Sequence, residues 1–350
     1  MRRIMLKIMF LRLLNEESAL MSTFFQSTSF HGRCQKISNL DHHIFHLTLF
    51  TSLTIVAKSF NALSQLETSL FLRYVIFRAL CYHFRMKLVS WNLNGIRAVH
   101  NKGLFEPCIE TLKPDIICFQ ETKAEEHQSE VDLPEYEEYW NSAKKKGYSG
   151  TAIFSKVKPE SVHVNFPADI AKKYKLEGDG YGDPNEEGRI LVAEYKDFQV
   201  LTVYTPNSKP DLSRLTLRHT QWDPAFLEYC LRLEKVKPLL ICGDMNVAHM
   251  PDDLANPKAN EGEHGYTNEE REGFSALIEE GFVDTFRMFT KGNGHYTWWS
   301  HFANSRARNV GWRIDYFLAS TSLSKKITHA AIYPEIYGSD HCPISIEISV

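Results

Sequence analysis

The chain has 350 residues, enough for one large domain or two ordinary ones. Its 43% hydrophobic, 24% charged and 12% aromatic residues are typical of a soluble globular protein, and its net charge is −3. The seven cysteines are odd in number and include no CxxC spacing, which excludes a zinc framework or disulfide scaffold and favours a reducing compartment.

The composition of the chain changes at residue 85. Residues 1–85 contain no proline and one glycine, and they carry ten Lys/Arg against four Asp/Glu, whereas 86–350 carry 30 against 39. The most apolar stretch of the first segment is interrupted by Arg73 and Arg78 and is too short for a membrane span. Residues 1–85 are therefore an N-terminal extension: a targeting segment, an interaction region, or upstream sequence included by too early a start codon.

From residue 86 onward, short β-branched runs alternate with helical patterns. The runs predict strands at 87–91, 115–120, 150–155, 189–195, 199–204, 238–244, 312–320, 327–334 and 342–349. Apolar periodicity predicts helices at 103–113, 213–236 and 268–281, and Pro224 should kink or divide the second of these. Strands interspersed with helices predict a single α/β domain over residues 86–350, with layers packed around sheet cores.

Polar clusters lie at the ends of six predicted strands. They are Asn92 and Asn94, Glu121, Asn207, Asp244 and Asn246, Asp315, and Asp340 with His341. Taken singly, each could be a turn or capping residue. Ligand sites in open α/β sheets lie outside strand ends, so six clusters together predict one functional site. Asp315 lies in an otherwise apolar run, where a buried carboxylate is costly without a partner, and His341 is the expected partner.

The chemistry of these groups favours a hard metal ion. Carboxylates and amides with a single imidazole and no thiolate suit Mg²⁺, for which Mn²⁺ can substitute, whereas zinc prefers more His or Cys. No G-x-S-x-G serine elbow is present in the sequence. The inventory therefore predicts metal-assisted attack of water on a phosphodiester.

Six motifs resemble those of a known family of DNA-repair enzymes. They are MKLVSWNLNGIRA, CFQETK, TVYTPNS, GDMNVAH, NVGWRIDYFLAS and GSDHCP. The resemblance, which runs from Met86 to the C-terminus, is to the exonuclease III type of apurinic/apyrimidinic endonuclease in the endonuclease/exonuclease/phosphatase superfamily. QET and SDH alone would indicate only the superfamily, whose lipid and small-molecule phosphodiesterases and phosphatases are the alternative. GIRA, DMNVAH and GWRIDYF are narrower and favour the DNA-repair branch.

The resemblance implies a fold, a substrate and a location. The implied fold is two packed mixed β-sheets flanked by helices, the four-layer DNase I-like sandwich. The implied activity is hydrolysis 5′ to abasic sites in double-stranded DNA, with 3′–5′ exonuclease and 3′-phosphatase activity on blocked 3′ ends. The implied enzyme is a monomer that does not bind membranes. Its expected location is the bacterial cytoplasm with the nucleoid, or an organelle or the nucleus if residues 1–85 are a targeting segment.

The resemblance also implies residue roles. The implied catalytic residues are Asp244, His341, Tyr204, Asp315 and Asn246. The implied surroundings of the metal are Glu121, Asn92 and Asp340, joined by Asp244, Asn246 and His341. The implied substrate-binding residues are Asn94 and Asn207 near the DNA backbone, and Trp298, Trp312 and Ile314 in an apolar pocket for an extruded sugar that lacks its base.

Phosphate binding requires basic residues although residues 86–350 are acidic overall. Two clusters are predicted to grip phosphates, Lys144–Lys146 and Arg306–Arg313, whereas Lys172–Lys175 is expected to be a solvated surface. Two features depart from the family: Pro210 and Asp211 where some relatives place a groove-inserting arginine, and a long loop at 168–187. Both concern DNA grip and strand preference rather than bond cleavage.

Overall fold

The structure is a computed structural model that describes residues 85–176 and 178–349. The predicted extension therefore lies outside the described residues, except for Arg85, which begins the first strand. The division of the chain at residue 85 stays a prediction. No helix in the described part of the chain is long and apolar enough to cross a membrane.

The first sheet has six strands in the order β11-β12-β1-β2-β4-β3. Their bounds are β11 Ile327–Ile332, β12 Ile344–Ser349, β1 Arg85–Asn92, β2 Ile116–Gln120, β4 Thr151–Ser155 and β3 Glu137–Asn141. Strands β1 and β2 are parallel and the other neighbours are antiparallel, so the sheet is mixed.

The second sheet repeats this plan in the order β5-β6-β7-β8-β10-β9. Its strands are β5 Ser161–Val164, β6 Ile190–Glu194, β7 Gln199–Tyr204, β8 Leu239–Asp244, β10 Asp315–Ser320 and β9 Phe282–Asp284. Only β7 and β8 run parallel. All predicted strands are present, and β3, β5 and β9 are additional edge strands that the sequence patterns did not predict.

The two sheets pack face to face because each central strand is apolar on both sides. Successive side chains of a strand point to opposite faces. Leu88 and Leu240 accordingly enter the core shared by both sheets. Val89 packs with the helices that cover the first sheet, and Ile241 packs with those that cover the second. The result is the predicted four-layer α/β sandwich.

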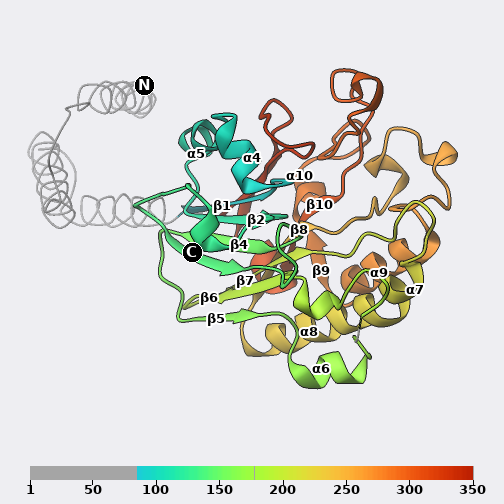
Figure 1. Cartoon of the computed structure of the whole chain (residues 1–350), viewed down its shortest axis with the longest axis horizontal. Helices are drawn as coiled ribbons and strands as arrows, with labels where there is room; N and C mark the ends of the chain where they lie inside the picture. The colour runs from blue at the N-terminus through green and yellow to red at the C-terminus, as the bar shows by residue number, and fades with distance from the viewer. Residues whose placement is uncertain (1–84, 177, 350) are drawn as a thin grey trace, which may run out of the picture. The chain divides into compact units, whose positions relative to one another are not determined.

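Helices form the two outer layers of the described body. Figure 1 shows α4 (Ile96–Asn101) and α5 (Phe105–Leu112) on one side of the strands, with α6 (Ala168–Lys173) and α8 (Asp223–Val236) on the other. The remaining helices are α7 Leu215–Leu217, α9 Asn268–Glu279, α10 Thr285–Phe289 and α11 Thr321–Ser324.

The predicted helix at 213–236 is divided, as Pro224 led us to expect. A π-helical turn at Arg218–Trp222 separates α7 from α8, and Pro224 lies in the first turn of α8. The Asp223 N–H donates to the Arg218 carbonyl in this turn, so the N–H that Pro224 lacks falls where the helical hydrogen-bond pattern already departs from i→i−4. The predicted helix at 268–281 is α9, and Thr267 and Glu270 form a capping box at its start.

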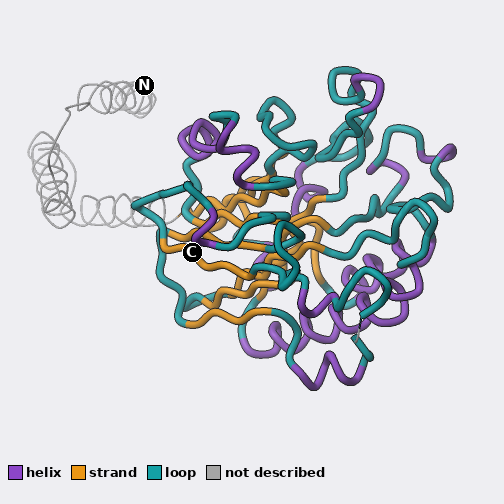
Figure 2. The backbone as a smooth tube through the Cα atoms, viewed as in Figure 1, coloured by secondary structure: helices purple, strands orange, loops and turns teal. Residues whose placement is uncertain are grey.

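The registers of the strands bring the polar clusters to one edge. Asn92 pairs with Gln120 at the ends of β1 and β2. Asp244 lies opposite Tyr204 on one side and Asp315 on the other. Long loops, teal in Figure 2, extend beyond the ends of the strands. The remaining polar residues of the clusters follow or precede strands in such loops.

Candidate active site

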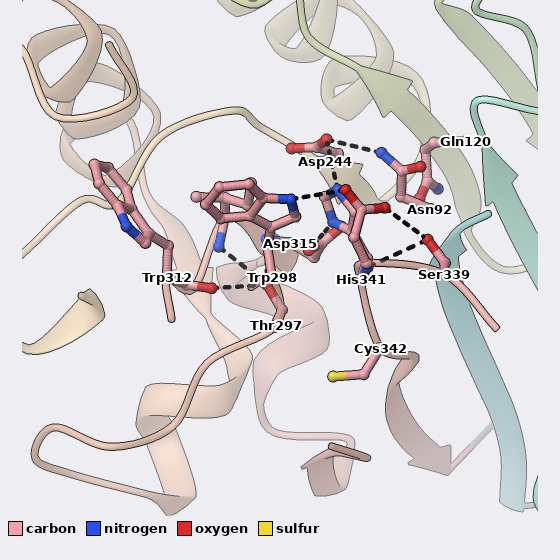
Figure 3. Close-up of polar contacts among 12 residues, drawn as sticks. Asn92, Gln120, Asp244, Thr297, Trp298, Trp312, Asp315, Ser339, His341 and Cys342 are labelled. Atoms are coloured by element: carbon pink, nitrogen blue, oxygen red, sulfur yellow. Dashed lines mark hydrogen bonds and ion pairs between the residues drawn. The ribbon is translucent and has the colours of Figure 1, made fainter. Parts of the chain in front are cut away.

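Three titratable side chains converge where the two sheets meet. Glu121, Asp244 and His341 each offer one ligand atom, and these atoms all lie within 4.8 Å of one another. Glu121 follows β2, Asp244 ends β8, and His341 precedes β12. The widely spaced motifs of the sequence therefore share one site, and Figure 3 shows Asp244, Asn92 and His341 facing each other.

An amide holds the two carboxylates together. Asn92 Nδ2 donates to Glu121 Oε1 at 3.0 Å and to Asp244 Oδ2 at 2.9 Å. Its own Oδ1 accepts from the backbone N–H of Asn94 at 3.0 Å. Asn92 thus brings two like charges together without adding a third, and its predicted role as a metal ligand stays a prediction.

His341 and Asp315 form the predicted buried pair. His341 Nδ1 lies 2.8 Å from Asp315 Oδ2, and both residues are buried. Burial alone would lower the pKa of His341, but the carboxylates of Asp315, Asp244 and Asp340 outweigh it and raise the pKa. These carboxylates favour the protonated imidazole, whose Nε2 lies 3.8 Å from Asp244 Oδ2.

Asp244 sits in an environment that disfavours its charge. Burial raises the pKa of Asp244, and although His341 opposes the rise, Asp315 and Glu121 add to it. Asp244 Oδ1 accepts from the backbone N–H of Asn246 at 2.8 Å. Both carboxylate oxygens are thus oriented by donors, one from Asn92 and one from Asn246.

Tyr204 faces the same centre and rests on a cation that the sequence patterns did not single out. Burial raises the pKa of Tyr204, Glu121 and Asp244 raise it further, and Arg189 partly counteracts them. The guanidinium of Arg189 lies 4.6 Å from the Tyr204 ring and donates to the Tyr204 carbonyl at 2.9 Å. Tyr204 is therefore kept as a neutral phenol that can donate a hydrogen bond.

Three residues of the site have left-handed backbones. The φ angles are 49° at Asn94, 50° at Glu121 and 48° at Asn246. Such angles are uncommon for residues other than glycine and are concentrated at functional sites. They turn the chain immediately after β1, β2 and β8, so that the polar side chains point across the edge of the sheets.

The donor set fits a magnesium-sized ion. Magnesium is bound by one or two carboxylates and completes its coordination with water and phosphate oxygen. Glu121 and Asp244 supply these carboxylates, and burial of Asp244 among like charges favours a nearby cation. The described residues place no cysteine in this cluster, which argues against a soft metal.

Asp340 and Asn207 lie in the surroundings of this cluster. Asp340 Oδ1 accepts from Asn94 Nδ2 at 2.9 Å, and Asp340 Oδ2 accepts from Trp298 Nε1 at 3.0 Å. Asn207 Nδ2 donates to Asn246 Oδ1 at 3.3 Å. The roles expected of Asp340 toward the metal and of Asn207 toward DNA stay predictions.

An apolar cluster adjoins the polar centre. Trp298, Trp312 and Ile314 gather there, and with them pack Ala248, Leu254 and Tyr266. The rings of Trp298 and Trp312 are perpendicular, with centroids 6.5 Å apart. Trp298 also forms a β-bridge with His341, so the cluster directly borders the histidine. Trp299, by contrast, is buried in a separate cluster.

The prediction that the Arg306–Arg313 cluster grips phosphates is wrong for Arg313. Arg313 is 1% exposed and forms ion pairs with Asp253 at 2.8 Å and Asp284 at 2.7 Å. Arg306 Nη2 donates to the carbonyls of Pro334 and Ile336. Arg313 is buried in ion pairs, Arg306 is half-buried against loop carbonyls, and Arg308 is exposed, so the predicted contact of Arg308 with phosphate stays a prediction.

The structure supports the expectation for one of the two lysine clusters and leaves the other as a prediction. Lys173 pairs with Glu228, in agreement with a solvated surface at 172–175. Lys144 pairs with Glu186 at an exposed position, and its predicted contact with DNA stays a prediction.

Two further residues of the site were missed by sequence reasoning. Lys123 Nζ lies 2.9 Å from Glu121 Oε2 and also donates to Asn94 Oδ1. Thr297 Oγ1 accepts from the backbone N–H groups of Ile314 and Asp315, both at 3.1 Å. The lysine of CFQETK was a visible signal because it follows the glutamate by two residues, whereas nothing local marks Thr297.

Known proteins resemble this chain over the described body. Residues 89–341 match the model of the Endonuclease/Exonuclease/phosphatase family. An exodeoxyribonuclease of Bacillus subtilis (strain 168) is 46% identical over 266 residues, which are 76% of this chain and 100% of that protein. The DNA repair nuclease APEX1 of Danio rerio is 42% identical over 272 residues, covering 76% of this chain and 83% of that protein.

A solved structure resembles the same part of the chain. The crystal structure of an AP endonuclease from Leishmania major superposes with a TM-score of 0.65 at 29% sequence identity. The match covers 76% of this chain and 88% of that one.

Proposed function

Because the chain belongs to the endonuclease/exonuclease/phosphatase family, we propose that it is a DNA-repair nuclease that cuts duplex DNA 5′ to abasic sites. The cut would leave a 3′-hydroxyl. One observation carries the proposal: Glu121, Asp244 and His341 converge within 4.8 Å, directly beside the apolar cluster of Trp298, Trp312 and Ile314. The polar centre suits phosphodiester hydrolysis, and the apolar cluster distinguishes abasic DNA from a small phosphoester.

Glu121 and Asp244 would hold one Mg²⁺ or Mn²⁺ ion. When bound, this ion would supply positive charge to the scissile phosphate and make water easier to deprotonate. Lys123 Nζ contacts Glu121 Oε2 and offsets part of the negative charge of the two carboxylates. The remaining steps belong to side chains of the chain itself.

Asp244 would orient the attacking water and accept its proton. Its oxygens are fixed by Asn92 and by the backbone of Asn246, so the carboxylate has one orientation. A general base is most effective when its pKa lies near the working pH, and burial shifts the pKa of Asp244 upward in that direction.

His341 and Tyr204 would stabilise charge on the phosphate. The raised pKa of His341 keeps its Nε2 protonated, which suits donation to a phosphate oxygen rather than metal binding. Asp315 holds the imidazole by Nδ1 and fixes its direction. The phenol of Tyr204, whose pKa is raised, would donate a second hydrogen bond to a phosphate or leaving-group oxygen.

The apolar cluster would select the lesion. A missing base removes stacking and pairing, so an abasic sugar leaves the duplex at lower cost than an intact nucleotide. Trp298 and Trp312 would contact this sugar with their ring faces. Relatives are named as an exodeoxyribonuclease and a DNA repair nuclease, which supports DNA as the substrate class.

The test is cleavage of a defined duplex by the full chain. A labelled duplex with one abasic-site analogue is incubated with Mg²⁺, with EDTA, and beside an undamaged duplex of the same sequence. We expect one cut, 5′ to the lesion, with a 3′-hydroxyl product, only in the presence of Mg²⁺. A Glu121→Gln variant should require more Mg²⁺ for the same rate.

Two further substrates define the range of the activity. A recessed 3′ end and a 3′-phosphate end, each tested under the same conditions, measure exonuclease and phosphatase activity. Cleavage that persists in EDTA, or hydrolysis of a small phosphodiester with no cut at the lesion, would contradict the proposal.

A further inference from the structure

Trp298 lies between the segment that leads to Asp315 and the segment that contains His341. Its backbone forms β-bridges with Trp312 on one side and with His341 on the other. The backbone N–H of the next residue, Trp299, donates to the backbone carbonyl of Asp340 at 3.1 Å. The segment around Trp298 therefore fixes the apolar cluster and the Asp340–His341 loop relative to each other.

The side chain of Trp298 has two different contacts. Its ring packs at a right angle to that of Trp312, within the apolar cluster. Its indole N–H points the other way and donates to Asp340 Oδ2 at 3.0 Å. Figure 3 shows Trp298 between Trp312 and His341, with its nitrogen directed toward the polar centre.

A continuous chain of hydrogen bonds leads from this indole to Glu121. The other oxygen of Asp340 accepts from Asn94 Nδ2 at 2.9 Å. Asn94 Oδ1 accepts from Lys123 Nζ, and the same ammonium lies 2.9 Å from Glu121 Oε2. The links pass through the Asp340 carboxylate, the exposed amide of Asn94 and the ammonium of Lys123, and they end at the carboxylate expected to hold the metal.

We propose that Trp298 is a positioning residue that couples the apolar cluster to Glu121, one of the two carboxylates expected to hold the metal, through Asp340, Asn94 and Lys123. The inference rests on the proposed function, which assigns the pocket and the metal site. A sugar against the ring would restrain the indole, and the N–H would hold Asp340 Oδ2 in one orientation. Binding of the lesion and binding of the metal would then favour each other by the same factor, as linkage requires.

The first test is metal binding by the DNA-free protein. Mn²⁺ is titrated calorimetrically into the full chain and into Trp298→Phe, which keeps a smaller apolar ring and removes the N–H donor. Loss of a group that orients metal ligands weakens binding by about 10-fold or more, and we expect a change of about that size. Trp312→Phe is the matched control, because Trp312 belongs to the same cluster and its substitution leaves the Trp298–Asp340 hydrogen bond in place.

A double-mutant cycle separates coupling from a general structural effect. The same titration is made with Asp340→Ala, which removes both acceptor oxygens, and with the double variant Trp298→Phe/Asp340→Ala. If Trp298 acts through Asp340, its substitution adds no further loss of Mn²⁺ affinity once Asp340 is changed. Equal losses in both backgrounds would overturn the proposal, and so would unchanged Mn²⁺ affinity in Trp298→Phe.

DNA binding provides the second readout. In EDTA, Trp298→Phe should retain the preference for abasic over intact duplex because the apolar wall remains, whereas Trp312→Ala should lose it. In the unchanged protein, cleavage of the abasic duplex reports on the proposed function itself. If the unchanged protein cleaves the abasic duplex but Trp298→Phe binds Mn²⁺ with unaltered affinity, the coupling is refuted and the proposed function is not.

Discussion

Glu121 and Asp244 differ in how their charges are balanced. Lys123 lies beside Glu121, whereas Asp244 is buried and its nearest cation is the imidazole of His341 at 3.8 Å. Asn92 joins the two carboxylates without adding charge. Burial and the neighbouring carboxylates raise the pKa of Asp244, which suits this carboxylate to accept a proton.

Substitution of Asp244 tests this assignment at the scale of one residue. Asp244→Asn keeps the shape of the side chain and its Oδ1 acceptor for the Asn246 N–H, but it cannot accept a proton. We expect single-turnover cleavage of an abasic duplex to slow by about 10³-fold, within the range for loss of a general base. Affinity for the same duplex, measured in EDTA, should not change. A parallel loss of DNA affinity would make Asp244 a structural residue.

Among the elements, the parallel pair β7 and β8 sets the geometry of the site. Its register places Tyr204 opposite Asp244. Gly243 has φ 133°, and a Cβ atom there would lie 2.0 Å from the carbonyl oxygen of Val203 on the neighbouring strand. Close approach of the two backbones, and with it the spacing of Tyr204 and Asp244, therefore depends on the absence of a side chain.

Gly243→Ala tests this dependence on close approach. The methyl group would force β7 and β8 apart, and we expect the free energy of unfolding to fall by about 3 kcal/mol or more. Gly262→Ala is the control, since Gly262 also has a positive φ, 81°, but a Cβ atom there would meet nothing within 4 Å. The control should cost about 1 kcal/mol from backbone strain alone. Urea unfolding measures both, and equal losses would show that strain, not strand separation, is responsible.

At the scale of the whole molecule, a buried ion network joins distant parts of the second sheet. Arg313 connects Asp253, in the loop after β8, to Asp284 at the end of β9. Arg287 adds a second cation to Asp253. This network holds the segment before β10 that carries Trp312 and Ile314, so loss of its charges should loosen the apolar cluster as well as the fold.

Acid should weaken this network in a predictable direction. Burial would raise the pKa of Asp253, but Arg313 and Arg287 outweigh it and lower the pKa below its ordinary value. The ionised Asp253 carboxylate therefore stabilises the fold fully above the pKa of an unfolded aspartate, about 3.9. This stabilisation is lost as the pH falls through the lower pKa of the folded state. The difference in unfolding free energy between the unchanged chain and Asp253→Asn should therefore shrink below about pH 4. A difference that stays constant from neutral to acidic pH would contradict the prediction.

Truncation tests the organisation of the whole chain. The family match lies within residues 89–341, and 76% of this chain covers 100% of the Bacillus subtilis relative. We therefore expect residues 85–350 to cleave an abasic duplex with the kcat/KM of the full chain. A lower value after truncation would show that residues 1–84 contribute to catalysis or DNA binding.

The class of fold and most of the chemistry can be inferred from the sequence alone. Central strands were predicted from continuous apolar runs, and α9 from its periodicity and acidic first turn, because these signals depend only on neighbours along the chain. The short edge strands β3 and β5 were missed because each is partly exposed and carries no strong apolar pattern. Glu121, Asp244 and His341 were identified because each is a polar residue at the end of a predicted strand and lies in a motif of the family.

Which side chains contact one another depends on the tertiary structure. Arg313 was predicted to contact DNA and is instead buried between two aspartates. The hydrogen bond from Trp298 to Asp340 joins residues 42 positions apart, and that from Asn92 to Asp244 joins residues 152 apart. Such contacts follow from strand register and from the packing of one sheet on the other. No local pattern encodes them, because the partners become neighbours only when the two sheets close on their shared core.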